Sequence, residues 1–583
     1  MTLGLLLERA AASSRGVRFL DGAERESFYS YAALFERATG VAGGLRSIGI
    51  GPGDRVGIIL PTAPDFYDAF FGALGVGAIP APLYPPVRLG RLQEYHQRTA
   101  SLLRACQARV VITSRGIRRI LGRTMEQSAV SLGCLSLPDL PRSPAPPHSA
   151  SCDDAALIQF SSGTTADAKP VRLTHRQILA NVEAISRTIL DAFPEGPDLT
   201  HSGVSWLPLY HDMGLVGCLV VAVAHPSDLT LIPPEIFAAR PALWLRAISR
   251  YRATVSAAPN FAYGYCVERI REEELSGVDL SSWRLALNGA EPVTPRVLSR
   301  FIERFRAYGF REEALTPVYG LAEATLAVTF SDPRRAFASV AFEREKLTRE
   351  GVARPAAGGL PLVSVGKPLP GYEIRLVDDG GALAPSGQVG RIFVRGPSLM
   401  EAYHERPEAT RAVMKDGWLD TGDRGFFFQE NLFLYGREKD LIILRGRNYV
   451  PQDIEQALEG LPGLRTGCTA AVGIVQEEDA GEAGEILVIL AERARGRAGT
   501  ADGELVGAIR ERVNERLGLV AERVLILEPG TLPRTSSGKL RRNEARRLYL
   551  EGALTPPASV TGLRLAVEAI RSTLAFARGR KFR

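Results

Sequence analysis

The sequence predicts an α/β protein with a large N-terminal part built on a mostly parallel sheet and a smaller α+β part near the C-terminus. With 583 residues, the chain is too long for one compact core. Apolar strand patterns alternate with helical patterns up to about residue 330, which is typical of a parallel sheet with helices on both faces. Beyond residue 440 these patterns restart on a smaller scale, which indicates a second domain.

The first predicted elements fit this architecture. Residues 28–49 predict a helix, and Val56–Leu60 and Val110–Thr113 predict buried strands. A proline-rich loop, 141–148, then leads to Ala155–Ile158, which we expect to be the central strand of the sheet.

Composition excludes several classes of protein. Apolar residues make up 45% and charged residues 23% of the chain, as in ordinary soluble proteins. The net charge of +6 is scattered, so we expect no nucleic-acid binding, although a modest positive field suits an anionic substrate or an acidic partner. The cysteines form no Cys-x-x-Cys pair, which favours a reducing compartment. The N-terminus lacks the pattern of a secretory signal, and prolines interrupt the longest uncharged stretch, 69–87, so we expect a cytoplasmic protein that spans no membrane.

A loop rich in hydroxyl groups follows the strand Ala155–Ile158. Gly163 lets successive backbone N–H groups point at one anion, while the hydroxyls and Lys169 add further donors, a combination that suits a polyphosphate. The spacing is not that of a Walker loop, so a polar turn before a helix beginning near Thr174 is the alternative. The loop residues that carry this prediction are Ser161, Ser162, Gly163, Thr164, Thr165 and Lys169.

Three polar turns, at 257–261, 285–292 and 318–325, each end a predicted strand. Because ligands bind outside the carboxyl ends of parallel strands, these turns and the hydroxyl-rich loop predict one crevice. Tyr319 would stack on a purine there, and Glu323 would hold Mg²⁺. The alternatives are core packing for the tyrosine and a helix N-terminal charge for the glutamate.

Two further acidic segments are candidates for function. The pair His211-Asp212 lies between apolar runs, where it would gate an apolar tunnel or serve as a satisfied structural histidine. Asp423 lies in a predicted tight turn, 417–423, where it would accept both ribose hydroxyls or act as a turn residue. Residues 331–364 predict a surface insertion, followed by a hairpin of strands 373–377 and 390–394.

The C-terminal part contains a lysine loop and a tail. Pro533–Leu540 carries Lys539 between predicted helices at 504–517 and 539–550. The tail 553–583 predicts a linker and then a helix that ends in basic residues. This helix would pack on the small domain or fray, or it would dock an acidic carrier. Its apolar stripe comprises Leu563, Val567, Ile570 and Leu574.

Taken together, these segments resemble the adenylate-forming enzymes from about residue 5 to residue 550: acyl- and aryl-CoA synthetases, luciferases and the adenylation domains of peptide synthetases. Within this superfamily the chain is most similar to the fatty acyl-AMP ligases, in which an insertion at the position of 331–364 restrains the small domain. The motifs that carry the resemblance are Leu207–Leu215, Ala258–Ala262, Asn288–Pro292, Tyr319–Thr325, and Arg445–Asn448 with Pro451–Glu455.

The resemblance implies a β-barrel-like subdomain, a mobile small domain, and boundaries at 1–437, 438–552 and 553–583. It implies ATP as co-substrate, Mg²⁺ at Glu323, ATP phosphates at the hydroxyl-rich loop, a hinge at Lys439, and catalytic roles for Lys539 and His211. The residues implied for adenine and ribose are Gly289, Ala290, Glu291, Tyr319, Gly320, Asp423 and Arg437.

The implied reaction joins a fatty acid to AMP and then passes the acyl group to a separate acyl carrier protein of polyketide or lipopeptide biosynthesis. A CoA ligase of the same fold and a non-catalytic nucleotide-binding homologue are the alternatives. The chain departs from the family loop at Ala166, Ala168 and Pro170, and Pro170 removes a backbone donor. Ala322 stands where CoA synthetases usually have threonine. The acyl-AMP ligases also have alanine at this position.

Overall fold

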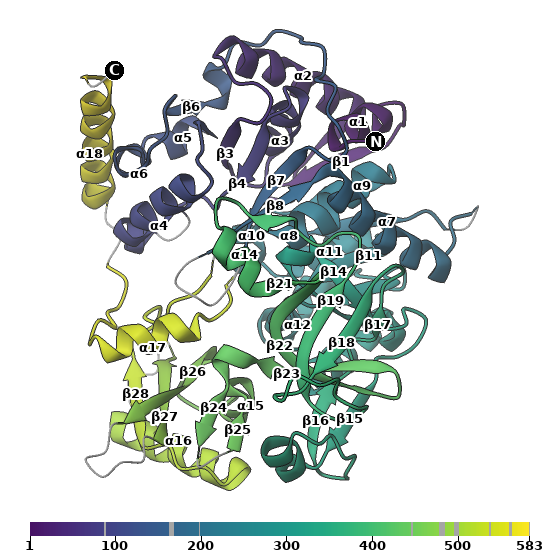
Figure 1. The fold of residues 1–583 in the computed structure, drawn as a ribbon, viewed down its shortest axis with the longest axis vertical. Coiled ribbons are helices and arrows are strands. Elements are labelled where there is room, and N and C mark those ends of the chain that lie inside the picture. Colours follow the sequence, from purple (N-terminus) through teal and green to yellow (C-terminus); the bar gives the residue numbers. More distant parts are fainter. Residues whose placement is uncertain are drawn as a thin grey trace.

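The fold is described from a computed structural model that shows a large lobe and a small lobe (Figure 1). The described residues are 1–86, 89–161, 168–196, 199–444, 447–476, 484–494, 501–535, 538–558 and 562–581; within these ranges the side chains of 476, 484, 562–566 and 577–581 are not described. No helix among these residues is both long enough and apolar enough to cross a membrane.

The centre of the large lobe is a nine-stranded sheet, and this confirms the predicted α/β fold. Its middle strands run parallel to one another, and its outer pairs β13–β14, β14–β17 and β1–β2 are antiparallel. In sheet order the strands are β17 (Lys367–Pro368), β14 (Ala327–Phe330), β13 (Leu315–Gly320), β12 (Leu285–Asn288), β11 (Val255–Ala258), β9 (Ser202–Ser205), β10 (Asp228–Leu231), β1 (Gly16–Leu20) and β2 (Glu26–Ser30).

The helices around the nine-stranded sheet contribute further side chains to the apolar core of the large lobe. Helix α11 buries Trp244, whose indole N–H donates to Ser256 of β11, and helix α13 buries Phe301 against Tyr263 of α12. The helices that precede or connect these strands include α1 (Leu3–Ala10), α8 (Asp212–Gly214), α9 (Val221–Ala224), α10 (Pro234–Ala239), α11 (Ala242–Arg250), α12 (Asn260–Arg269) and α13 (Pro295–Phe305).

A second, four-stranded parallel sheet accounts for the strands predicted near residues 56 and 110. Its order is β4 (Ile79–Pro82), β3 (Arg55–Ile59), β5 (Val110–Thr113) and β6 (Cys134–Ser136). The helix predicted at 28–49 begins only at Tyr31, because residues 26–30 pair with β1 and Ser30 caps the helix. The helices of this region are α2 (Tyr31–Ser47), α3 (Pro64–Gly75), α4 (Leu92–Ala105), α5 (Arg115–Arg118) and α6 (Gly122–Gln127).

The prediction that Ala155–Ile158 forms the central parallel strand was wrong. The strand β7 (Ala155–Phe160) pairs antiparallel with β8 (Pro170–Thr174), and β8 pairs with β20 (Ala402–Tyr403) in a separate small sheet. A short apolar run shows that a strand is buried but not which sheet it joins. The next helix, α7 (His175–Ala192), begins where the sequence predicts, with a capping box between Thr174 and Gln177.

An antiparallel subdomain follows the nine-stranded sheet. Strands β18 (Glu373–Val377) and β19 (Gly390–Arg395) form the predicted hairpin, and β19 pairs in turn with β22 (Trp418–Phe428). The tight turn predicted at 417–423 was wrong, because the chain turns at Asp416-Gly417 and then continues as strand β22. The remaining elements are α14 (Pro407–Val413), β21 (Met414–Lys415) and β23 (Asn431–Arg437).

The segment 331–364 folds as a hairpin of β15 (Ser339–Phe342) and β16 (Leu360–Val363) joined through the short helix η8 (Lys346–Glu350). It is more than a surface loop, because Phe342 is fully buried against Phe426 and Phe433. It also reaches the small lobe, where Arg344 lies 3.7 Å from Asp453.

The small lobe has its own sheets and apolar clusters, one around Ile454 and Ile489 and another around Val488 and Leu532. Its helix α16 ends at Leu517, as predicted, and α17 begins at Arg542 rather than at Lys539. The elements are β24 (Ile442–Leu444), β25 (Arg447–Tyr449), α15 (Pro451–Ala457), β26 (Leu464–Gln476), β27 (Gly484–Arg493), α16 (Asp502–Leu517), β28 (Arg523–Leu527) and α17 (Arg542–Leu550).

The last helix, α18 (Gly562–Lys581), lies against α6 of the large lobe (Figure 1). The expectation that it packs on the small domain was therefore wrong. Its buried contacts come from Ser572 and Ala575, whereas Ile570 and Leu574 of the predicted stripe are 61% and 53% exposed. Small side chains allow close helix contact, and the apolar stripe alone did not reveal them.

Candidate active site

The candidate site lies where the carboxyl ends of β11, β12 and β13 meet the small lobe. These strands pair in parallel register, with Ala258 opposite Asn288 and Asn288 opposite Pro317, so the turns that follow them share one sheet edge. A cavity of about 1820 Å³ opens there and is lined by residues of both lobes.

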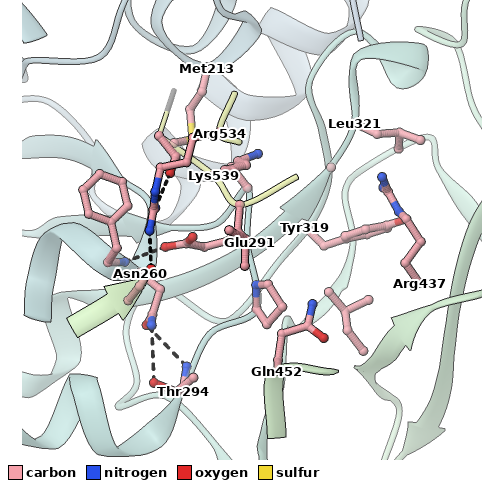
Figure 2. Close-up of a pocket in the computed structure, with 18 of the residues that line it drawn as sticks. Met213, Asn260, Glu291, Thr294, Tyr319, Leu321, Arg437, Gln452, Arg534 and Lys539 are labelled. Atoms are coloured by element: carbon pink, nitrogen blue, oxygen red, sulfur yellow. Dashed lines mark hydrogen bonds between the residues drawn. The ribbon is translucent and has the colours of Figure 1, made fainter. Parts of the chain in front are cut away.

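Hydrogen bonds from polar side chains connect the turns at this sheet edge. The side-chain oxygen of Asn260 accepts hydrogen bonds from the Thr294 backbone N–H at 3.3 Å and the Asn288 amide at 3.4 Å (Figure 2). Glu291 accepts a hydrogen bond from the backbone N–H of Phe261, and burial raises its pKa. These contacts tie the turn after β12 to the start of α12.

The backbone of the predicted adenine segment has a special conformation. Ala290 lies in the left-handed region with φ of 67°, which is costly for a residue with a side chain and is typical of functional turns. Gly320 needs to be glycine, because a Cβ there would lie 1.7 Å from the carbonyl oxygen of Leu326. Gly289 is similar, with Val318 atoms at 2.7 and 2.8 Å from the position of a Cβ.

Tyr319, Asp423 and Arg437 lie together on one side of the cavity. The Tyr319 hydroxyl donates to one oxygen of Asp423 at 2.8 Å, and Arg437 Nε donates to the other at 3.0 Å. Register explains the second contact, because Asp423 and Arg437 face each other across β22 and β23. Burial and the Asp423 carboxylate raise the pKa of Tyr319, and that carboxylate also raises the pKa of Arg437.

Lys539 enters the same cavity from the small lobe, beside Glu291 (Figure 2). Two hydrogen bonds close its loop: the Thr535 N–H donates to the Lys539 carbonyl, and the Lys539 N–H donates to the Thr535 hydroxyl. Arg534 donates to the Gly538 carbonyl at 2.7 Å. Burial lowers the pKa of Lys539, and the carboxylates of Asp212 and Glu291 offset part of that effect.

His211 lines the cavity next to its apolar side. Its Nδ1 lies 2.6 Å from Asp212 Oδ1, while its Nε2 is buried and has no hydrogen-bond partner among the described residues. Burial alone would raise the pKa of Asp212, but His211 and Lys539 outweigh it and hold that pKa below its usual range. A buried nitrogen without a hydrogen-bond partner, on a residue that lines a cavity, is suited to contact a ligand.

Glu323, the predicted metal carboxylate, accepts a hydrogen bond from the Tyr403 hydroxyl at 2.8 Å. The Lys169 ammonium lies 4.6 Å from the centre of the same Tyr403 ring. Burial and the Glu323 carboxylate raise the pKa of Tyr403. Sequence reasoning missed this tyrosine, because it lies far from Glu323 in the chain and no motif marks it.

The Glu323 carboxylate suits a magnesium ion that is shared with a nucleotide. Among the described residues no cluster of three or more His, Cys, Asp or Glu side chains could hold a metal ion alone. Mg²⁺ is commonly bound by one or two carboxylates together with substrate phosphates and water, and the Glu323 carboxylate at the cavity wall meets that need.

Part of the predicted phosphate loop lies outside the described residues: Ser162, Gly163, Thr164 and Thr165. Its two ends are described and lie side by side, because Ser161 N donates to the Lys169 carbonyl at 3.0 Å. Both of these residues line the cavity. Lys439, the predicted hinge, is exposed and lies in a short helical turn, Glu438–Asp440, between β23 and β24.

Comparison with known proteins places this geometry in a family. A putative acyl-CoA synthetase of Caulobacter vibrioides is 34% identical over 94% of this chain and 96% of its own length. A medium-chain-fatty-acid–[acyl-carrier-protein] ligase of Moorena producens is also 34% identical, over 93% of each chain. A solved structure from studies of fatty acyl-adenylate ligases of E. coli and L. pneumophila superposes with a TM-score of 0.86 at 35% identity, covering 94% of this chain and 98% of that one.

A family model described as AMP-binding enzyme matches residues 7–404. That match spans the strands and turns that form the carboxyl edge of the cavity, from β7 to Tyr403. The chain is an enzyme that belongs to the AMP-binding enzyme family and resembles its fatty acyl-AMP ligases.

Proposed function

We propose that this enzyme activates a long-chain fatty acid with ATP, forms an acyl-adenylate and pyrophosphate, and then passes the acyl group to the phosphopantetheine thiol of a separate acyl carrier protein. The observation that carries this proposal is the position of Lys539. It belongs to the small lobe, yet it lines the same cavity as Tyr319, Asp423 and the apolar side chains near His211.

In this proposal the purine stacks on Tyr319 beside the backbone of 289–291. Asp423, held by Arg437, accepts the ribose hydroxyls once the nucleotide displaces the Tyr319 hydroxyl from it. The ends of the hydroxyl-rich loop, Ser161 and Lys169, flank the ATP phosphates. The apolar cavity beyond His211 takes the acyl chain, with walls that include Ile185, Trp206, Gly217, Leu326 and Phe330.

The first reaction needs no covalent intermediate on the protein. A carboxylate oxygen of the fatty acid bonds to the α-phosphorus of ATP while the bond from that phosphorus to the bridging oxygen breaks, and pyrophosphate leaves. Both reactants are anionic, so the Lys539 ammonium lowers the barrier by stabilising negative charge at the reacting phosphate. Bound Mg²⁺ at Glu323 would add positive charge near the phosphates.

The transfer partner is inferred from charge and from the insertion. The Moorena relative is named as a carrier-protein ligase, and a basic enzyme suits an acidic carrier. The ion pairs Arg344–Asp453 and Glu345–Arg447 connect the insertion to the small lobe, which disfavours the rotated state that a CoA ligase uses. The proposed domains are 1–437, 438–552 and 553–583, with the hinge at Lys439.

The decisive experiment incubates the protein with ATP, Mg²⁺ and a series of medium- to long-chain acids, and detects acyl-AMP by mass spectrometry. ATP–pyrophosphate exchange separates this enzyme from a non-catalytic nucleotide-binding homologue, which would show none. CoA and a phosphopantetheinylated carrier protein are then offered in parallel. Acyl-CoA as the main product would contradict the carrier assignment and favour the CoA ligase, the activity in the name of the Caulobacter relative.

A further inference from the structure

The two lobes are also joined by contacts that involve neither the proposed hinge at Lys439 nor the insertion. Arg91, at the start of α4 in the large lobe, donates from Nη2 to the carbonyl oxygens of Gly530 at 3.1 Å and Thr531 at 3.0 Å in the small lobe. The same nitrogen donates to the Thr555 carbonyl at 3.0 Å, in the linker that leaves α17. Only 20% of the Arg91 side chain is exposed.

The carbonyls that Arg91 holds lead directly into the lysine loop. Thr531 and Leu532 are 2% and 1% exposed, and the Leu532 N–H donates to the buried Glu492 carboxylate at 2.9 Å. Pro533 and the turn that presents Lys539 follow at once. A fixed position at residues 530–531 therefore limits where Lys539 can lie, because only a short stretch of chain separates Thr531 from Lys539.

The linker after α17 runs across the same contact. The Ala558 N–H donates to the Gly90 carbonyl at 3.2 Å, next to Arg91. Glycines make room for the linker: a Cβ on Gly90 would lie 2.6 Å from the Ala558 oxygen, and a Cβ on Gly530 would lie 3.1 Å from Pro557. A Cβ on Gly90 would also lie 3.3 Å from Pro557 Cβ, so Pro557 lies beside a glycine of each lobe.

Helix α18 fastens the far end of this extension to the large lobe, beside α6 (Figure 1). The Gly122 N–H donates to the Ser572 hydroxyl at 2.7 Å, and Ser572 is 1% exposed. Glu568 lies 3.7 Å from Arg123, and the Arg118 guanidinium lies 5.1 Å from the centre of the Phe576 ring. The small lobe is consequently attached to the large lobe at both ends of its chain.

We propose that Arg91 is a positioning residue for acyl-adenylate formation, and that it and the C-terminal extension form a strap that holds the Lys539 loop over the cavity. The strap adds a further attachment to the proposed hinge and to the insertion's ion pairs, Arg344–Asp453 and Glu345–Arg447, and so limits how far the small lobe can swivel. This proposal rests on the proposed function for its catalytic consequence, but the attachment itself does not.

The test uses two full-length variants that open the strap at different points. Arg91→Ala removes the contacts with the Gly530, Thr531 and Thr555 carbonyls. Gly122→Leu leaves the small lobe untouched and displaces α18, because a Cβ on Gly122 would lie 2.1 Å from the Ser572 carbonyl oxygen. Arg115→Ala is the matched control, since that arginine pairs with Asp139 within the large lobe.

Hydrogen–deuterium exchange measures the attachment independently of catalysis. We expect faster exchange at residues 523–532 and 553–558 in Arg91→Ala and at 553–558 in Gly122→Leu, with no change in Arg115→Ala. In the kinetic arm, kcat for acyl-AMP formation should fall about tenfold in Arg91→Ala, which corresponds to about 1.4 kcal/mol, while KM for ATP and for the acid stays unchanged. Arg91→Lys should recover part of the rate, since an ammonium can also donate to several carbonyls.

Unchanged exchange in both strap variants would overturn the proposal. So would increased exchange with kcat equal to that of Arg115→Ala, because Arg91 would then only hold the tail. The wild-type protein could make no acyl-AMP while the two strap variants still exchange faster than it does. That result would count against the proposed function and in favour of the attachment.

Discussion

The Tyr403 hydroxyl donates a hydrogen bond to the Glu323 carboxylate at 2.8 Å, and this contact joins two distant parts of the large lobe at the candidate metal position. Tyr403 belongs to β20, which pairs with β8 at the end of the hydroxyl-rich loop. A single strand pair therefore connects the candidate phosphate loop to the candidate magnesium ligand. A fixed carboxylate binds a metal at lower entropic cost than a mobile one.

We predict that Tyr403→Phe raises the Mg²⁺ concentration needed for half-maximal ATP–pyrophosphate exchange about tenfold, the usual lower limit for losing such a supporting contact. The ring and its contact with Lys169 remain, so the fold should be unchanged. Tyr95→Phe is the control, because its hydroxyl bonds to the Tyr84 carbonyl away from the cavity. An unaltered Mg²⁺ requirement in Tyr403→Phe would show that Glu323 needs no such support or holds no metal.

Local patterns predicted elements well, and long-range pairing explains what was missed. The helix after Thr174 was predictable because its capping box and apolar spacing lie within the segment itself. The partner strand of β7 was not, since pairing with β8 depends on a loop that reverses the chain. Asp423 was named from its place in a predicted turn and Arg437 through a family resemblance, but their mutual contact depends on strand pairing that neither observation reveals.

The same distinction separates the predicted from the unpredicted site residues. Lys539 and Glu323 belong to short motifs with recognisable neighbours. Tyr403 and Arg91 act through contacts with residues 80 and about 440 positions away, which no local pattern reveals. The tail stripe misled for a related reason, because α18 uses Ser572 and Ala575 for its contacts instead of its largest apolar side chains.

Lys539→Ala should reduce acyl-AMP formation about a hundredfold, the usual loss when one preorganised charge is removed from a transition state. The large lobe holds the other candidate ligands, so ATP binding should persist, and thermal unfolding should match that of the wild type. Pyrophosphate release measures the rate, and Lys415→Ala, which changes an exposed lysine outside the cavity, serves as control. Pyrophosphate release at the wild-type rate would refute the role of Lys539.

A pH-dependent prediction concerns Asp453, where the insertion meets the small lobe. Burial raises the pKa of Asp453 from 3.8 to about 6, although Arg344 opposes the rise. The folded state therefore binds the proton more tightly than the unfolded state. The stability that this carboxyl contributes is fully present below pH 3.8 and is lost as the pH rises through about 6.

Asp453→Asn mimics the protonated form, so it should raise the free energy of unfolding at pH 7.5 by up to about 3 kcal/mol. The difference in the free energy of unfolding between Asp453→Asn and the wild type should be smaller at pH 5, where Asp453 is largely protonated. Thermal unfolding at the two pH values measures both effects. Destabilisation at pH 7.5 would instead mean that the Arg344 ion pair outweighs burial.

The final prediction concerns acyl-chain length. Gly217 lies in the short helix Leu215–Val220 and lines the apolar side of the cavity. A Cβ there would lie 2.8 Å from Leu326 Cδ2, the movable end of a side chain, so a larger residue can be accommodated while it fills space. Gly217→Leu should shift the preference toward shorter acids and leave KM for ATP unchanged.

Excluding about three methylene groups at about 0.8 kcal/mol each costs about 2.4 kcal/mol, or about fiftyfold in kcat/KM. We therefore expect kcat/KM for the longest acids to fall about fiftyfold relative to the short ones in Gly217→Leu, with an intermediate change in Gly217→Ala. Acyl-AMP formation across a chain-length series gives this ratio directly. A ratio identical in all three proteins would mean that the acyl chain does not pass Gly217, because a side chain projecting into its path must discriminate by length.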